Sequence, residues 1–217
     1  MFRSALVFVL CGLLLVALAE HSHSHDHDHI DEPEADVSQV TCGSVIKLRN
    51  IKHNTRLHSH SITYGSGSGQ QSVTGFPNIN DANSLWLIKG EFGKPCSTGT
   101  AIKNGDVIRL LHLQTGKALH SHLHRSPLSG NQEVSAYGDN GGDTGDNWKV
   151  VVTKDSTWMR SSKIRLQHAD TGLNLMNTHH KFGSPIPGQM EIVCSSSNNN
   201  EASWMTEEGF YFPVEKK

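Results

Sequence analysis

Two pairs of histidines stand at alternate positions of the chain: His58 and His60, then His120 and His122, with His124 beyond the second pair. Alternate side chains of an extended strand point to the same face, so each pair would present two imidazoles together. Imidazoles bind zinc and change charge near neutral pH, which makes the pairs candidates for a metal or pH-sensing site. No HExxH motif accompanies them, and we expect structural or surface histidines.

A second group of histidines occupies every other position of a polar run: His21, His23, His25, His27 and His29. With the interleaved aspartates, this run could bind zinc, copper or nickel ions weakly. The apolar stretch before it, after Arg3 and ending in a small-residue cleavage pattern, predicts a cleaved secretory signal peptide over residues 1–19. We expect residues 20–39 to be a disordered leader, in which no packed neighbours would fix metal ligands.

The serines, histidines and aspartates form no motif of nucleophilic catalysis. No Gly-x-Ser-x-Gly motif occurs, and residues 65–69 are a Gly/Ser run typical of a turn. The acidic loop at residues 138–146 could steer a basic partner or bind calcium weakly, but its spacing matches no EF-hand. We therefore expect no enzyme and no cofactor.

Composition narrows the fold class. Of 217 residues, 35% are hydrophobic and 18% are charged, and 20 glycines are spread along the chain. Such frequent glycines leave few windows for long helices, which argues against helical bundles. The net charge of −2 carries no basic excess, so no nucleic-acid partner is expected. No segment after residue 19 is apolar enough to predict a membrane span.

One pattern occurs three times. Residues 45–48, 107–110 and 163–166 each end in Ile, a basic residue and Leu, an alternation typical of a half-buried strand. In every copy a second Leu follows the first after 9 residues, and a Trp follows the first after 38. These positions form the predicted core: Leu48, Leu57, Trp86, Leu110, Leu119, Trp148, Leu166, Leu175 and Trp204.

Each copy has room for roughly four short strands separated by Gly-, Pro- and Ser-rich turns. A unit of this size cannot bury its apolar face alone, so three must close around a common axis. Closure also removes exposed sheet edges. The sequence therefore predicts an all-β protein, a β-trefoil over residues 40–213. Its equivalent strands would point in different directions, so the two His-Ser-His pairs should diverge.

Parts of these copies resemble known sequences. Leu-x-Ser-His and His-x-x-Thr-Gly-x-x-Leu, each with its trailing Trp, resemble the MIR motifs of protein O-mannosyltransferases, inositol trisphosphate receptors and ryanodine receptors. Residues 40–45, 56–60, 64–75 and 126–136 resemble the stromal cell-derived factor 2 family, and the likeness covers residues 40–213. It implies three MIR repeats, at residues 37–91, 99–154 and 155–209. The third is the weakest, because Met176 and Thr178 replace histidines.

The resemblance also implies a function. Members of this family are proteins of the endoplasmic reticulum lumen. They bind a luminal J-domain co-chaperone and, through it, the chaperone BiP, and they help to keep unfolded clients soluble in quality control and the unfolded-protein response. Some relatives end in a His-Asp-Glu-Leu-type retrieval signal, whereas this sequence ends in Pro-Val-Glu-Lys-Lys. The expected location is the endoplasmic reticulum lumen, with secretion as an additional outcome; no residues of a partner-binding face are predicted.

The alternative function is that of a glycan-binding trefoil lectin acting on O-mannosylated or other glycoproteins. A ricin-like Gln-x-Trp pattern would support it, but Ser84, Asp146 and Ala202 stand two residues before the three tryptophans. The discriminating feature would be an exposed aromatic ring beside an acidic residue in equivalent loops.

Three cysteines remain after the signal peptide, in a compartment where disulfides persist. Cys42 begins the first copy, and Cys96 lies in the connection entering the second. Closure around a threefold axis brings the starts of successive copies together, so we predict a Cys42–Cys96 disulfide. Cys194 is expected to be buried and free.

Overall fold

A computed structural model describes residues 36–138 and 142–215 of the chain. The signal peptide and the leader histidines at 21–29 lie outside these residues. The described chain contains twelve strands: β1 (Val45–Asn50), β2 (Arg56–Thr63), β3 (Gln71–Phe76), β4 (Trp86–Gly90), β5 (Val107–His112), β6 (Ala118–Arg125), β7 (Gln132–Tyr137), β8 (Trp148–Val152), β9 (Ile164–His168), β10 (Asn174–Lys181), β11 (Met190–Ser195) and β12 (Trp204–Phe210). A short 3₁₀ turn precedes every fourth strand: η1 (Ala82–Ser84), η2 (Thr144–Asp146) and η3 (Asn200–Ala202).

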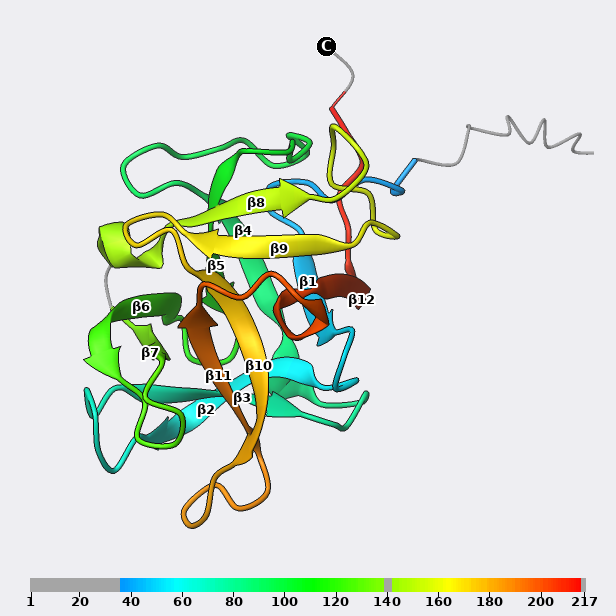
Figure 1. Ribbon diagram of the computed structural model, residues 1–217. Coiled ribbons are helices and arrows are strands. Elements are labelled where there is room, and N and C mark those ends of the chain that lie inside the picture. Colours follow the sequence, from blue (N-terminus) through cyan, green and yellow to red (C-terminus); the bar gives the residue numbers. More distant parts are fainter. Residues whose placement is uncertain (1–35, 139–141, 216–217) are drawn as a thin grey trace, which may run out of the picture. The chain divides into compact units, whose positions relative to one another are not determined.

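Six strands close into a barrel. β1 pairs with β4, β4 with β5, β5 with β8, β8 with β9, β9 with β12, and β12 with β1, all antiparallel. The remaining strands form three hairpins, β2–β3, β6–β7 and β10–β11. β3, β7 and β11 also pair with one another in a triangle that covers one end of the barrel (Figure 1). This is the predicted β-trefoil, and the prediction of an all-β fold is confirmed.

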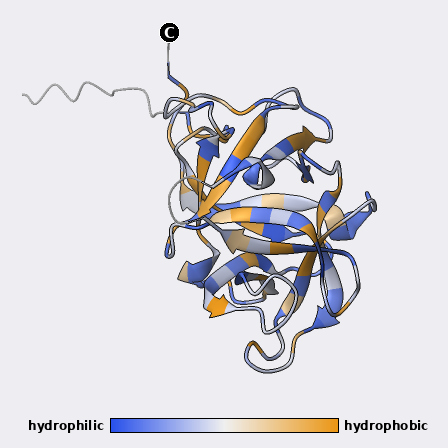
Figure 2. Cartoon of the chain, turned by 90° about the vertical axis from the view of Figure 1, so that its left-hand side faces the viewer, coloured by the Kyte–Doolittle hydropathy of each residue, from blue (hydrophilic) through white to orange (hydrophobic). Residues whose placement is uncertain are grey.

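Alternation of apolar and polar residues explains why the barrel strands face as they do. β5 is buried at every second residue, and the same period is visible as alternating colours along the strands in Figure 2. Leucines and tryptophans of the repeated pattern meet inside. All nine predicted core side chains are fully buried. The repeated spacing therefore identified the centre of the core.

The three repeated tryptophans also make the same hydrogen bond. Trp86 donates its indole Nε1–H to the carbonyl of Leu57, Trp148 to that of Leu119 and Trp204 to that of Leu175, at 2.8, 2.8 and 2.9 Å. A buried indole N–H without an acceptor would cost about 1–3 kcal/mol, so the constant Leu-to-Trp interval serves this bond as well as the packing.

A second ring of buried residues closes the other end of the barrel. Val40 donates its backbone N–H to Trp158, Trp158 to Ile102 and Ile102 to Val40, at 2.8, 2.8 and 3.0 Å. All three side chains are buried. Each stands eight residues before the first Leu of its copy, so the sequence holds a signal for these core positions that lies outside the predicted core. Just before Val40, Ser38 accepts a hydrogen bond from the backbone N–H of Arg160, so ordered pairing begins inside the stretch expected to be leader.

The cysteines divide into one bonded pair and one free thiol. Cys42 and Cys96 form a disulfide, with their Cα atoms 6.2 Å apart. Cys194 is free and buried, and burial raises the pKa of its thiol to about 12. It lies on β11 opposite Leu175, where Gly75 and Ala136 stand opposite the equivalent leucines of the other hairpins. Cys194 therefore acts as the small residue that this position requires.

Two buried glutamates fasten the turns of neighbouring hairpins. Glu133 of β7 accepts hydrogen bonds from the backbone N–H and the hydroxyl of Ser68, in the turn of the first hairpin. Glu191 of β11 accepts bonds from the backbone N–H of Ser129 (3.1 Å) and the Ser126 hydroxyl, in the turn of the second. Repeats two and three thus each hold the hairpin loop of the preceding repeat.

Candidate functional site

In the first His-Ser-His pair, the leading histidine is buried rather than exposed on the surface. His58 is only 4% exposed, because η1 lies over the face of β2 that strand alternation would leave open to solvent. Its Nδ1–H donates to the Asp81 carboxylate at 2.6 Å, and Ser84 donates its hydroxyl to the same oxygen at 2.6 Å. Burial raises the pKa of Asp81, but these bonds outweigh it and leave the pKa below its usual value.

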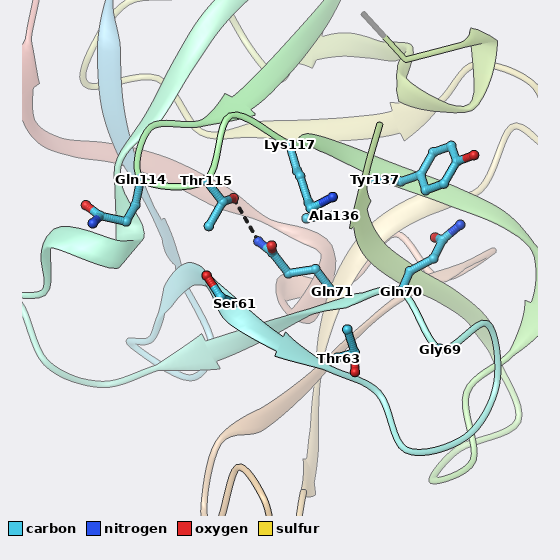
Figure 3. A pocket seen from close by; sticks show the side chains of 10 residues that line it. All are labelled: Ser61, Thr63, Gly69, Gln70, Gln71, Gln114, Thr115, Lys117, Ala136 and Tyr137. Carbon is cyan, nitrogen blue, oxygen red and sulfur yellow. Dashed lines mark hydrogen bonds between the residues drawn. The ribbon is translucent and has the colours of Figure 1, made fainter. Parts of the chain in front are cut away.

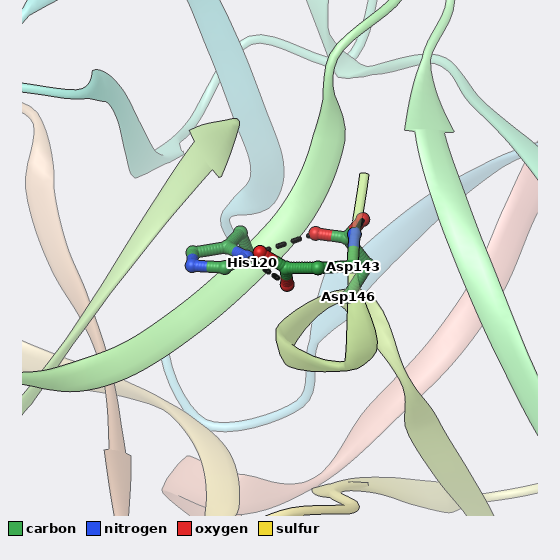
Figure 4. A group of neighbouring side chains, drawn as sticks. All are labelled: His120, Asp143 and Asp146. Atoms are coloured by element: carbon green, nitrogen blue, oxygen red, sulfur yellow. Dashed lines mark hydrogen bonds and ion pairs between the residues drawn. The ribbon is translucent and has the colours of Figure 1, made fainter. Parts of the chain in front are cut away.

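The second pair repeats this arrangement with different residues. His120 is 5% exposed and lies 2.9 Å from the fully buried carboxylate of Asp146 and 3.7 Å from that of Asp143, as Figure 4 shows. Asp143 is the N-cap of η2: its carboxylate accepts the Gly145 N–H, while Asp146 accepts the N–H of Asp143 in return. The imidazole is therefore held by a reciprocal capping box.

The third repeat replaces the pair by apolar groups. Met176 takes the place of the histidine and Ala202 that of Asp146, and with Val193 they form a small buried cluster of their own. Because histidine and aspartate disappear together, the pair behaves as one packing unit between the second strand of a repeat and its 3₁₀ turn. We interpret the buried histidines as structural.

His120, Asp143 and Asp146 are also the one group of three potential metal ligands among the described residues. One imidazole and two carboxylates are a reasonable donor set for a divalent cation. Three of the oxygens, however, already accept hydrogen bonds from His120 and from two backbone amides. To bind here, a cation would have to break the His–Asp hydrogen bond and the capping bonds of η2. The arrangement therefore favours a structural role for this group over ion binding.

The outer histidine of each pair has another setting. His60 and His122 are half-buried. Burial, with the neighbouring His58, lowers the pKa of His60. His122 donates from Nε2 to Glu133 at 3.2 Å, and its ring lies 4.6 Å from that of His124. The two pairs contact different acids, Asp81 in the first and Asp146 and Glu133 in the second, and no group of potential metal ligands among the described residues joins them.

Two further buried histidines form hydrogen bonds with the turn between the first and second strands of their own repeat. His112 donates from Nε2 to the Asn83 carbonyl and accepts at Nδ1 from the Thr115 hydroxyl, both at 2.9 Å. His168 makes the same pair of bonds with Gly145 and Thr171. Burial lowers the pKa of both imidazoles, in keeping with these neutral-state bonds. Asn50 stands in their place in the first repeat and caps its own turn.

Open hollows lie where successive repeats meet. The hollow between repeats one and two has a volume of about 490 Å³, and most residues that line it are of polar type, including Gln70, Gln71 and Gln114, with the half-exposed ring of Tyr137 at one side (Figure 3). Gln71 is anchored by bonds to the hydroxyls of Ser59 and Thr115, at 2.8 and 2.9 Å. The corresponding hollow of the next interface, about 290 Å³, is lined by Leu123, Arg125, Gln132 and Cys194 among others.

Three glutamines, Gln71, Gln132 and Gln189, stand 15, 16 and 15 residues before the repeated tryptophans. The first two occupy the first position of β3 and β7, but the third does not begin a strand. Met190 begins β11, and Gln189 lies just before the strand. Repeat three therefore lacks a glutamine at the strand position that lines the first two hollows, and we expect no third hollow of the same composition.

Comparison with known proteins agrees with this architecture. The family model described as the MIR domain matches residues 51–206. A stromal cell-derived factor 2-like protein of Dictyostelium discoideum is 48% identical over 212 residues, which are 95% of this chain and 96% of the relative. Human stromal cell-derived factor 2 is 49% identical over 173 residues, 79% of this chain and 82% of the relative. The chain belongs to the stromal cell-derived factor 2 family.

Solved structures support the same assignment. The SDF2-like protein of Arabidopsis thaliana superposes with a TM-score of 0.79 at 46% identity, covering 82% of this chain and 99% of that one. The protein O-mannosyltransferase Pmt1-Pmt2 complex of S. cerevisiae, bound to its sugar donor, contains a similar region: TM-score 0.74, 31% identity, 87% of this chain and 29% of that chain. The designed threefold protein ThreeFoil, at 16% identity and a TM-score of 0.51, shares the fold alone.

Family membership makes the chain a MIR-domain protein of the secretory pathway. The relatives carry the names of factors and not of enzymes. Among the described residues, no helix has the length and apolar character needed to cross a bilayer.

Proposed function

We propose that this member of the family is a non-catalytic chaperone cofactor of the endoplasmic reticulum lumen. It binds a luminal J-domain co-chaperone, reaches a BiP-type chaperone through that partner, and keeps unfolded clients soluble as part of quality control and the unfolded-protein response. The observation that carries the proposal is the 48% identity to a family member along 95% of the chain.

The arrangement of polar groups supports a binding role over a catalytic one. His58 and His120 are buried against carboxylates, and His112 and His168 are committed to turn hydrogen bonds. A catalytic base needs a free nitrogen near a nucleophile and a substrate cavity. The hollows between the repeats instead present amides, hydroxyls and a few apolar side chains on a rigid frame, which suits recognition of another chain.

Affinity capture from endoplasmic reticulum luminal extract tests this proposal. The mature chain is immobilised, and bound proteins are eluted with salt and identified by mass spectrometry. A J-domain protein is expected as the main captured component, with the BiP-type chaperone lost when ATP is added and the J-domain protein retained. The purified chain together with its J-domain partner should delay the aggregation of a thermally unfolded client. This delay should not require nucleotide. Failure to capture a J-domain protein would contradict the proposal.

Glycan binding is the second candidate, and the first hollow favours it. Tyr137 is 42% exposed near Gln70, and Gln114 lines the opposite side of the same hollow (Figure 3), which is a suitable combination of stacking surface and hydrogen-bonding groups for a sugar. A similar region occurs in an O-mannosyltransferase complex. If captured glycoproteins elute with free mannose, and Tyr137→Ser abolishes their capture, this function replaces the first. Serine is the matched choice because Ser195 holds the equivalent place on β11.

A further inference from the structure

The most exposed large apolar side chain of the described residues is Leu123 of β6, at 85%. The equivalent positions of the other repeats hold Ser61 on β2 and His179 on β10, both polar. The fold therefore does not require an apolar group here. A leucine held in solvent on a rigid strand gains free energy only if something covers it.

Leu123 lines two hollows at once. One, of about 290 Å³, lies toward repeat three and contains Arg125 and Leu173. The other, of about 550 Å³, lies over η2 and is lined by residues that include Asp143, Thr144 and Asp170. The leucine thus forms an apolar ridge between two depressions, each large enough for one or two side chains of a partner.

The larger hollow is acidic. The Asp143 side chain is 55% exposed, and Asp170 is exposed and accepts a hydrogen bond from Thr144 at 2.9 Å. The residues that line this hollow include no Lys or Arg. Of its histidines, His168 has a pKa lowered by burial, while His120 and His122 each lie against an acid, Asp146 and Glu133. An ammonium or guanidinium group is the complementary ligand.

We propose that the Leu123 ridge and the acidic hollow beside it bind an extended segment of a partner protein, in which an apolar side chain is closely followed by Lys or Arg. The apolar group covers Leu123, and the cation enters the hollow between Asp143 and Asp170. In an extended segment, residues two apart point the same way, about 7 Å apart, which suits a ridge with an adjacent hollow. The proposal names a docking surface for the binding function above and rests on that function only for its biological meaning.

The other repeats supply conservative variants for a test. Leu123→Ser introduces the residue of repeat one. Asp170→Gln introduces the residue found at Gln114, and Asp143→Asn introduces the N-cap of η3, Asn199, which accepts the Glu201 N–H at 2.8 Å and so preserves capping. Each variant removes an apolar or charged group without breaking the local fold, which unchanged thermal unfolding verifies.

Binding is measured with the mature chain and fluorescein-labelled twelve-residue Gly/Ser peptides carrying Leu-Ser-Lys, Leu-Ser-Glu or Ser-Ser-Lys at the centre. We expect the Leu-Ser-Lys peptide to bind at least about tenfold more tightly than either control, and more weakly as salt increases. Leu123→Ser and the double variant Asp143→Asn/Asp170→Gln should each weaken it about tenfold. Ser61→Ala, in the equivalent hollow of repeat one, should leave it unchanged.

Equal binding of the Lys and Glu peptides, an unchanged affinity of Leu123→Ser, or no binding of Leu-Ser-Lys at millimolar peptide would each overturn the proposal. The peptide assay contains no chaperone, so its outcome is separate from that of the capture experiment. If Leu123→Ser loses the peptide but still captures the J-domain protein, the surface serves another partner or client. If wild-type chain binds the peptide but captures no J-domain protein, the proposed function fails and the docking surface stands.

Discussion

Replacing the buried His120–Asp146 pair by its apolar counterpart from repeat three tests whether the pair is structural. The single variants His120→Met and Asp146→Ala each leave a buried partner behind, since the two residues are 5% and 0% exposed and hydrogen-bonded at 2.9 Å. The double variant reproduces Met176 and Ala202, which pack together in the third repeat. The singles should therefore be strongly destabilised and the double no more so than either.

The magnitude follows from the burial. Removing one partner of a buried polar pair costs about 3 kcal/mol or more, because the other is left without its hydrogen bond. Replacing both by apolar residues leaves no buried group unpaired, so the double variant should lose no more than about 3 kcal/mol, against about 6 for additive changes, which is a coupling of at least about 3 kcal/mol. With a urea slope of roughly 2 kcal/mol per molar, each single change lowers the midpoint by about 1.5 M.

Urea unfolding followed by tryptophan fluorescence measures the free energies, and a double-mutant cycle gives the coupling. Asp143→Asn is the control: it preserves the cap and should change stability by less than about 0.5 kcal/mol. Additive losses in the double variant would refute the reasoning, since the histidine and the carboxylate would then contribute independently. A metal-binding role would instead appear as a gain of stability on adding zinc or calcium. The two single variants and the double variant would each abolish that gain.

Further predictions concern pH, the disulfide and the hairpin cap. Because burial lowers the pKa of His112, the unfolded state takes up its proton first, so the free energy of unfolding should fall as pH drops below about 6.5; His112→Asn should flatten this slope in urea titrations between pH 7 and 5.5. Changing Cys42 and Cys96 to serine should cost about 4 kcal/mol for a bridge across a sequence separation of 54, and non-reducing peptide mapping should find these two cysteines joined; a bridge containing the third cysteine would contradict the assignment. Glu191→Ala should cost about 3 kcal/mol and speed amide exchange at Ser129, whose N–H it binds; unchanged exchange there would show that the loop holds itself.

Much of the fold was legible in the spacing of a few apolar residues. The interval from Leu48 to Trp86, preserved in both later copies, predicted three equivalent units and their buried core. An interval of this kind is readable because strand length, turn length and the tryptophan's bond to the Leu57 carbonyl all depend on local chain geometry. The barrel end formed by Val40, Ile102 and Trp158 obeyed the same register but escaped notice, because its three residue types differ.

The surroundings of the buried histidines were harder to predict from the sequence. Strand alternation placed His58 on the face away from Leu57, but it did not reveal that η1 covers that face. The acids that bind the histidines are 23 residues away in Asp81 and 26 away in Asp146, at different positions of their 3₁₀ turns. A signal was present in retrospect: aspartates five or two residues before the repeated tryptophan occur only in the copies with a histidine directly after the second leucine.

By itself, the sequence determined the repeat, the trefoil and its tryptophan core, because these depend on short-range residue spacings that occur in each of the three copies. The hollows between repeats, the acidic surface beside Leu123 and the ties from Glu133 and Glu191 to neighbouring turns were decided by the tertiary structure. They bring together residues that are far apart in the sequence, by 65 and 62 positions in the two glutamate contacts, and that meet only after the chain has folded.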